Sequence, residues 1–185
     1  GEVFPHGVTK SAYFDQGFDA LINFDFQRRY AARGAACLAT LEPVFTEYAQ
    51  ALNNDPAFNV MTYISSHDTE LFSTRAKDDP VLQKKAAAAL LLLPGAVQVY
   101  YGDESGRRKG PGGSDPMQGT RSSMNWADID GGKADAVLAH WRKLGQFRAH
   151  HPAVGGGAHQ KLGEAPYAFA RVKDGDRVVI VQNTR

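Results

Sequence analysis

Residues 60–68 read Val-Met-Thr-Tyr-Ile-Ser-Ser-His-Asp, and residues 94–104 read Pro-Gly-Ala-Val-Gln-Val-Tyr-Tyr-Gly-Asp-Glu. In each stretch an apolar run ends in polar residues, Ser66-His67-Asp68 in the first and Gly102-Asp103-Glu104 in the second. The apolar runs are continuous rather than alternating, which is typical of parallel strands that are buried on both faces. In β/α barrels the chemistry takes place where such strands end. The two stretches therefore predict buried strands with candidate functional residues at their carboxyl ends.

Strand and helix patterns alternate along the first 150 residues. We expect strands over Glu2–Phe4, Ala20–Phe24, Val60–Ser65 and Val97–Tyr101. We expect helices where apolar residues recur at helical spacing, over Phe26–Asn53, Val81–Leu93 and Ala134–His150. This alternation indicates parallel β/α units. The four strands make only half of an eight-stranded barrel.

Proline and glycine mark the helix boundaries. Pro43 lies inside the first helical pattern and should kink that helix or split it in two. Asp79 is the expected N-cap of the second helix, with Pro80 at its first position. Pro94-Gly95 should end that helix.

The last thirty residues have a different character. Ala165–Val172 and Arg177–Gln182 alternate apolar and polar residues, and Lys173-Asp174-Gly175-Asp176 between them is a hairpin-type turn. Gly155-Gly156-Gly157, just before, is interpreted as a linker. The pattern predicts an antiparallel strand pair rather than another β/α unit. Because a lone hairpin is only marginally stable, we expect that the chain is cut at both ends.

Composition excludes several classes of function. Hydrophobic residues make up 43% of the 185 residues, charged residues 22%, and the formal net charge is +1, which favours neither a nucleic-acid partner nor a membrane surface. The longest apolar run, Ala86–Pro94, is too short to span a bilayer. Cys37 alone cannot form an internal disulfide and is expected to be a small core residue within the first helix.

The Gly- and Pro-rich stretch Ser105–Gly119 is too long for a bare connection between elements. We interpret it as an active-site loop that forms a wall of the substrate cleft. It contains the only tight run of basic residues, Arg107-Arg108-Lys109, which is expected to be solvated.

Glu2, His67 and Asp68 are the strongest candidates for chemistry. Cleavage of a glycosidic bond needs an acid to protonate the leaving oxygen and a carboxylate to act on the oxocarbenium-like centre. Glu2 and Asp68 are both interpreted as following apolar strand segments. Their side chains converge at one mouth if the strands are neighbours in one barrel. His67 can donate hydrogen bonds to sugar hydroxyls. Ser66-His67-Asp68 is not a Ser/His/Asp triad, because a triad requires proximity in space rather than in sequence.

Several motifs occur in an order that resembles glycoside hydrolase family 13, the α-amylase family. They are Gly1-Glu2-Val3-Phe4, Phe18–Phe24, Tyr63–Thr69, Pro94–Glu104 and Arg121-Ser122-Ser123-Met124-Asn125-Trp126. The resemblance covers nearly the whole chain and is closest in character to bacterial periplasmic α-amylases. It implies that Glu2 is the general acid/base at the end of strand five. It also implies that Asp68 is the second carboxylate, which stabilises the transition state, and that His67 binds the same sugar.

The resemblance also implies roles that this chain does not fill. The nucleophile of the family is an Asp at the end of strand four, in a Gly-x-Arg-x-Asp-type motif that is absent from the chain. No metal ligand or cofactor site is expected here, and the resemblance implies calcium only through residues outside the chain. The residues at the end of the Pro94–Glu104 motif are expected to be mainly structural; they are Tyr100, Tyr101, Asp103 and Glu104.

The predicted fold class is α/β, namely the second half of a (β/α)8 TIM barrel over residues 1–154, followed by the start of an antiparallel β domain over residues 155–185. The predicted function is retaining hydrolysis of α-1,4-glucosidic bonds in starch, glycogen or maltodextrins. The isolated chain is expected to be inactive and to pair with the missing N-terminal half of the barrel. The resemblance suggests a periplasmic or secreted parent protein.

Two alternatives stay open. A transglycosylase or branching enzyme of the same family would carry identical carboxylates. A non-catalytic, amylase-like interaction subunit of a membrane assembly would not need to keep both Glu2 and Asp68, so their presence argues against it.

Overall fold

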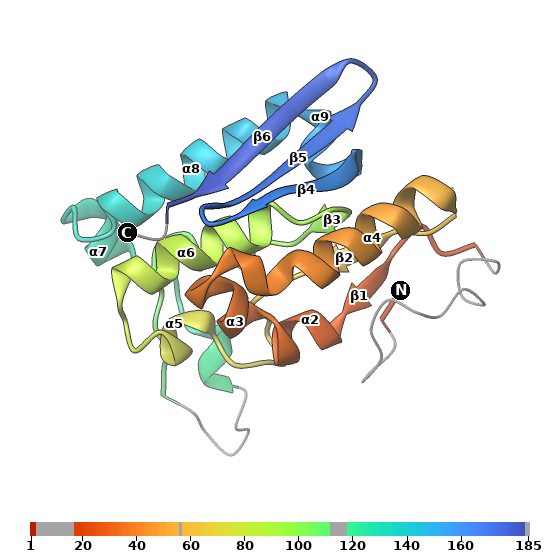
Figure 1. Ribbon diagram of the computed structural model, residues 1–185. Helices are drawn as coiled ribbons and strands as arrows, with labels where there is room; N and C mark the ends of the chain where they lie inside the picture. The colour runs from red at the N-terminus through yellow and green to blue at the C-terminus, as the bar shows by residue number, and fades with distance from the viewer. Residues whose placement is uncertain (3–16, 56, 112–117, 184–185) are drawn as a thin grey trace.

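A parallel sheet forms the centre of the barrel part. The computed structural model describes residues 1–2, 17–55, 57–111 and 118–183. Strands β1 (Leu21–Asn23), β2 (Val60–Thr62) and β3 (Ala96–Val97) lie in that order, and each pair is parallel (Figure 1). Helices connect the strands, as the alternating pattern predicts. The prediction of parallel β/α units is therefore confirmed.

The strands are shorter than predicted. β2 ends at Thr62 rather than Ser65, and β3 ends at Val97 rather than Tyr101. The residues beyond these points enter the loops that carry the polar motifs, because the ladder between β2 and β3 stops at Val97. Most of the predicted strand Glu2–Phe4 lies outside the described residues.

Gly1 nevertheless lies along the free edge of β1. Its amino group donates to Ala20 O at 2.8 Å, and Ile22 N–H donates to Gly1 O at 3.0 Å. These two hydrogen bonds flank Leu21, which is the pattern of a parallel ladder. The segment that carries Glu2 is therefore the next neighbour of β1, on the side away from β2.

The long helix predicted over Phe26–Asn53 is divided into several pieces. They are α2 (Phe24–Arg29), α3 (Ala31–Ala36), the 3₁₀ helix η1 (Leu38–Leu41) and α4 (Glu42–Asn54). Pro43 lies in the first turn of α4, so the predicted split occurs just before it. Cys37 is extended, with φ −154°, and lies half-buried at the break between α3 and η1. The expectation that Cys37 is a core residue inside a helix is therefore wrong.

Helix α6 (Pro80–Leu91) begins as predicted, because the Asp79 side chain accepts a hydrogen bond from Val81 N–H at 2.7 Å. It ends two residues before the predicted position. Helix α8 (Asp135–His150) agrees with its pattern to one residue. The short helices α5 (Phe72–Arg75), η2 (Gln118–Arg121) and α7 (Trp126–Asp130) lie in the loops that follow β2 and β3. None of the helices among the described residues is long and apolar enough to cross a membrane.

The C-terminal part is an antiparallel sheet of three strands, β4 (Ala158–Glu164), β5 (Tyr167–Lys173) and β6 (Asp176–Gln182). The predicted hairpin is β5–β6, and φ is positive at both Asp174 and Gly175, as a type I′ turn requires. The sequence pattern missed β4, because most of its residues are exposed and it lacks hydrophobic alternation.

The predicted linker is wrong in part, because Gly155 and Gly156 belong to the short helix α9 (Pro152–Gly156). Gly157 follows it in close contact with β5, where a Cβ would lie 3.0 Å from Val172 N. The domain boundary predicted after residue 154 falls inside α9, and the division into domains stays a prediction.

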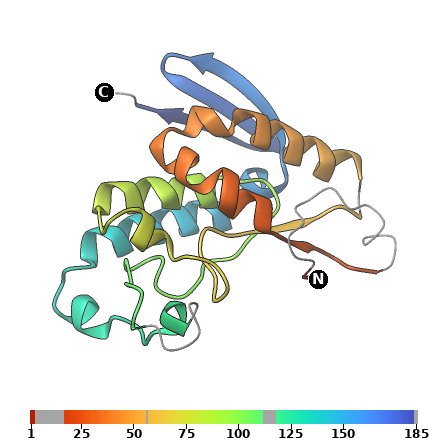
Figure 2. The ribbon, with the colours of Figure 1, turned by 90° about the horizontal axis from the view of Figure 1, so that it is seen from below.

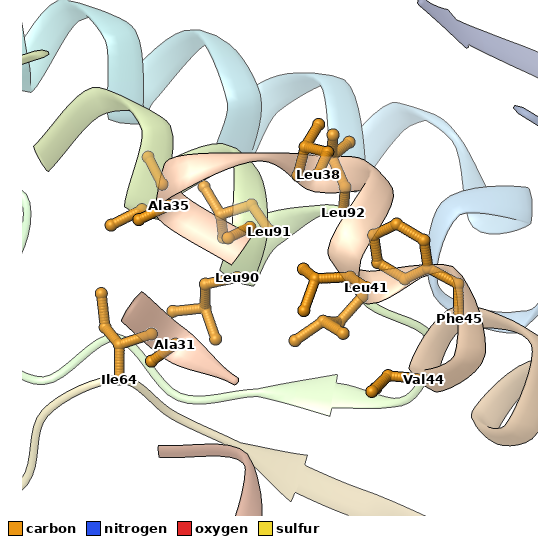
Figure 3. Packing of buried hydrophobic residues seen from close by; sticks show 14 of the residues in the cluster. Ala31, Ala35, Leu38, Leu41, Val44, Phe45, Ile64, Leu90, Leu91 and Leu92 are labelled. Atoms are coloured by element: carbon orange, nitrogen blue, oxygen red, sulfur yellow. The ribbon is translucent and has the colours of Figure 1, made fainter. Parts of the chain in front are cut away.

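One hydrophobic cluster joins the barrel helices to the antiparallel sheet. Figure 3 shows leucines of η1 and α6 pointing into this cluster, together with Ala31 and Ala35 of α3. Tyr167, Phe169 and Val178 of the antiparallel sheet belong to the same cluster. Figure 2 shows this sheet at one end of the molecule, and the loops after β2 and β3 at the other.

Arg171 of β5 is the largest buried side chain of this junction and is 0% exposed. Its Nη1 donates to Leu92 O at the end of α6 and to Val154 O in α9, each at 2.5 Å. The guanidinium carbon lies 4.9 Å from the ring centres of both Phe45 and Phe169. The end carbonyls of a helix have no partner inside the helix, so the cation satisfies groups that burial would leave unpaired.

Candidate active site

The turn after β2 carries two of the predicted site residues. Asp68 N–H donates to Ser66 Oγ at 3.2 Å, and Ser66 Oγ lies 2.9 Å from Thr69 Oγ1. His67 Nε2 lies 3.1 Å from Asp68 Oδ2, and about half of each side chain is exposed, 52% and 49%. The structure therefore brings His67 and Asp68 together on an accessible surface at the carboxyl end of β2.

Arg121 of η2, in the loop after β3, binds this turn. Its Nη2 donates to Asp68 Oδ1 at 2.8 Å, and its Nη1 donates to His67 O at 2.8 Å. Thr120 Oγ1 also donates to His67 O at 2.6 Å. The two Asp68 carboxylate oxygens thus have different partners, His67 on one and Arg121 on the other. The motif that begins at Arg121 is visible in the sequence, but its contact with the turn is not.

Glu2 is exposed and lies within electrostatic reach of the same turn. Burial is the main cause that raises the pKa of Tyr63 to about 12, and the negative charges of Glu2 and Asp68 both raise it further. The convergence of Glu2 and Asp68 at one mouth of the barrel stays a prediction. The catalytic roles of Glu2 and Asp68 remain predictions.

The basic run Arg107-Arg108-Lys109 is only partly solvated, which corrects the expectation for Arg107. The Arg107 side chain is 2% exposed, and its guanidinium carbon lies 3.9 Å from the Tyr101 ring centre. It donates to Tyr101 O at 2.9 Å, to Thr120 O at 3.0 Å and to Ser122 Oγ at 2.6 Å. These acceptors, together with Ser122 O at 3.1 Å, and the aromatic face replace the lost water, so the cation can be buried. Arg108 and Lys109 are exposed, as expected.

Arg107 therefore ties the loop after β3 to η2, from which Thr120 and Arg121 reach the His67–Asp68 turn. The base of the predicted active-site loop is closed by a hydrogen bond from Gly110 N–H to Gly119 O at 2.9 Å. Residues 112–117 of that loop lie outside the described residues, and its role as a wall of the cleft stays a prediction.

Asp103 lies beneath the turn, in the loop after β3. Its Oδ1 accepts a hydrogen bond from Ser65 Oγ at 2.5 Å. Burial raises the pKa of Asp103 to about 7, the neighbouring charge of Glu104 adds to the rise, and the bond from Ser65 opposes it. The sequence motif marks Asp103 as structural, and its bond with Ser65 has no signal in the sequence.

The part of the chain that the structure describes contains no cluster of candidate metal ligands. No three His, Cys, Asp or Glu side chains converge there in the manner of a metal site. Calcium binding elsewhere stays an expectation from the resemblance.

Comparisons with known proteins agree with this geometry. The family model for the α-amylase catalytic domain matches residues 1–129. The periplasmic α-amylase of Escherichia coli K12 is 50% identical over 182 residues, which are 98% of this chain and 25% of that protein. Maltogenic α-amylase of Bacillus acidopullulyticus is 36% identical over 101 residues, 55% of this chain and 16% of that protein. The chain therefore spans about a quarter or less of the length of these relatives.

Solved structures give the same fold. The crystal structure of an α-amylase from H. orenii matches with a TM-score of 0.72 at 23% identity, covering 99% of this chain and 42% of that one. A cyclic α-maltosyl-(1→6)-maltose hydrolase from Arthrobacter globiformis matches with a TM-score of 0.64 at 26% identity, covering 97% and 40%. The parallel strands with their helices are thus part of a (β/α) barrel, followed by an antiparallel β region. The chain belongs to the α-amylase family, glycoside hydrolase family 13.

Proposed function

We propose that the protein hydrolyses α-1,4-glucosidic bonds in starch, glycogen or maltodextrins with retention of configuration. The observation that carries this proposal is the exposed carboxylate of Asp68, held by His67 and Arg121 at the carboxyl end of β2. The 50% identity to a periplasmic α-amylase supports the choice of reaction. A carboxylate fixed in this way can stabilise positive charge that develops on the sugar ring. The same relative supports a periplasmic location.

In this proposal Glu2 protonates the leaving oxygen and later deprotonates water. His67 donates hydrogen bonds to hydroxyls of the sugar that Asp68 contacts. A retaining mechanism also needs a carboxylate nucleophile about 5–5.5 Å from the acid. We propose that the first half of the barrel supplies this nucleophile, through strands that pair with the free edge next to β1, where Gly1 lies.

The chain alone should therefore release no reducing sugar from soluble starch, whereas a longer protein that includes the preceding barrel strands should. Proton NMR of the first products from the longer protein should show the α-anomer, as retention requires. Glu2→Gln should abolish this activity, and Glu47→Gln, an acid of α4 outside the site, serves as the control.

Two outcomes would contradict the proposal. Starch hydrolysis by the chain alone that Glu2→Gln abolishes would place a nucleophile inside these 185 residues. Products longer than the maltodextrin supplied would identify a transglycosylase instead of a hydrolase.

A further inference from the structure

The Ser65 hydroxyl is the junction between the loop after β3 and the turn that carries His67 and Asp68. It donates to Asp103 Oδ1 at 2.5 Å and accepts from Phe72 N–H at 2.8 Å. Ser65 begins the turn and Phe72 opens α5 behind it, so one hydroxyl closes the turn at both ends. Ser65 is 0% exposed, so water does not compete for these bonds.

Asp103 is itself held firmly by its own loop. Its N–H donates to Tyr100 O at 2.9 Å. The carboxylate of the next residue, Glu104, is occupied by Gly102 N–H at 2.9 Å and does not reach Ser65. The Ser65 hydroxyl therefore has a fixed acceptor, and the turn takes its position from the loop after β3.

A carboxyl group that only filled space at this position would destabilise the folded state. Asp103 Oδ2 is buried and accepts no hydrogen bond from the described residues. A buried acid with an unpaired oxygen destabilises the folded state, and an apolar side chain would not. The acceptor at Oδ1 is what this side chain contributes.

We propose that Asp103, acting through Ser65, is a positioning residue that sets the placement of the Asp68 carboxylate. Arg121 holds the carboxylate itself, and the Ser65–Asp103 link holds the start of the turn. A displacement of about 1 Å of a catalytic group can lower a rate by as much as about 10²-fold, so a backbone anchor of this kind influences turnover. The kinetic part of the proposal rests on the function proposed above.

The titration of Asp103 makes the stability of the folded state depend on pH. Glu104 and Arg107 are the charged groups that act on Asp103, the first raising its pKa and the second lowering it. Because the folded pKa, about 7, lies above the ordinary value, 3.8, the folded state holds the proton more tightly than the unfolded state. The stability contributed by this proton is present in full below pH 3.8 and is lost as pH rises through about 7.

The test compares Asp103→Asn with Asp103→Ala. Asparagine keeps an oxygen that accepts from Ser65, whereas alanine removes it. In the longer enzyme, Asp103→Ala should lower kcat about 10-fold with KM changed less than about threefold, and Asp103→Asn should restore kcat to within about threefold of wild type. Between pH 5 and pH 8 the melting temperature of wild type should fall relative to that of Asp103→Asn, which has no group to titrate at this position.

Hydrogen exchange tests the same link without catalysis. In the 185-residue chain, the Phe72 amide should exchange at least about 10-fold faster in Asp103→Ala than in Asp103→Asn, because Ser65 then loses its fixed orientation. Asp55 is the matched control. Its Oδ1 accepts a hydrogen bond from Ala57 N–H just before β2, on the side away from the site. Asp55→Ala and Asp55→Asn should change neither kcat nor Phe72 exchange.

Equal kcat in Asp103→Ala and wild type would overturn the proposal. A kcat of Asp103→Asn no higher than that of Asp103→Ala would overturn it as well. Faster Phe72 exchange in a protein that hydrolyses no α-glucan would support the link and reject the proposed function instead.

Discussion

Asp68→Asn should lower kcat of the longer enzyme about 10²-fold or more, with little change in the free energy of unfolding. The substitution keeps the shape of the side chain but removes the negative charge that, in the proposed mechanism, faces the oxocarbenium-like transition state. Asparagine can still accept the hydrogen bond from Arg121 Nη2, which now reaches Asp68 Oδ1 at 2.8 Å. About half of the Asp68 side chain is exposed, so its neutralisation should affect folding little.

Glu70→Gln is the control for this prediction. Glu70 follows in the same loop, is 45% exposed and pairs with Arg75 at 2.9 Å, away from His67 and Asp68. It should keep kcat close to wild type. Reducing-sugar assays at saturating maltodextrin, with thermal melting on the same samples, provide the measurement. An Asp68→Asn enzyme that retains activity within a few-fold of wild type would remove Asp68 from the mechanism.

Arg171→Ala should destabilise the chain by about 3 kcal/mol or more, because two hydrogen bonds from a charged donor are lost at once. Leu92 O and Val154 O would then be left without their donor inside the junction of α6, α9 and β5. The space that the guanidinium fills between Phe45 and Phe169 would add a cavity. Burial lowers the pKa of Arg171 to about 9, so the side chain is still charged at neutral pH.

Arg171→Met separates the two causes, because methionine fills much of the space but donates no hydrogen bond. It should lie between wild type and alanine in stability. Arg177→Ala on β6 is the control, since that side chain is exposed and should matter little. Urea unfolding followed by circular dichroism measures all three variants. A methionine variant as stable as wild type would show that the bonds to the two carbonyls contribute nothing net.

The local signals in the sequence were reliable for the elements that a few neighbouring residues decide. Asp79 and Pro80 start α6 as predicted, and Asp174-Gly175 forms the predicted hairpin turn. The continuous apolar runs before His67 and Asp103 do form parallel strands, although shorter ones. The helix start and the hairpin turn depend on backbone preferences or caps within about one helical turn of the chain, whereas the strands were recognised by their continuous apolar composition.

The candidate site was predicted in part. His67 and Asp68 lie together where the strand-end rule predicts them, because residues adjacent in sequence at a strand end share one edge of the sheet. Their partners came from elsewhere, since Arg121 is 53 residues from Asp68 and Ser65 is 38 residues from Asp103. No pattern of spacing within one element contains such pairs.

The parallel β/α units, the antiparallel hairpin, the resemblance to the α-amylase family and the position of the His67–Asp68 turn all follow from the amino-acid sequence alone. The burial of Arg107 and Arg171, the place of Cys37 at a helix break and the strand β4 are evident only in the folded chain. Contacts between residues far apart in sequence decide the burial of the two arginines and the formation of β4. A cation can leave water only where distant carbonyls and aromatic rings replace its hydration, and an exposed strand such as β4 forms only when its neighbour, β5, offers a ladder.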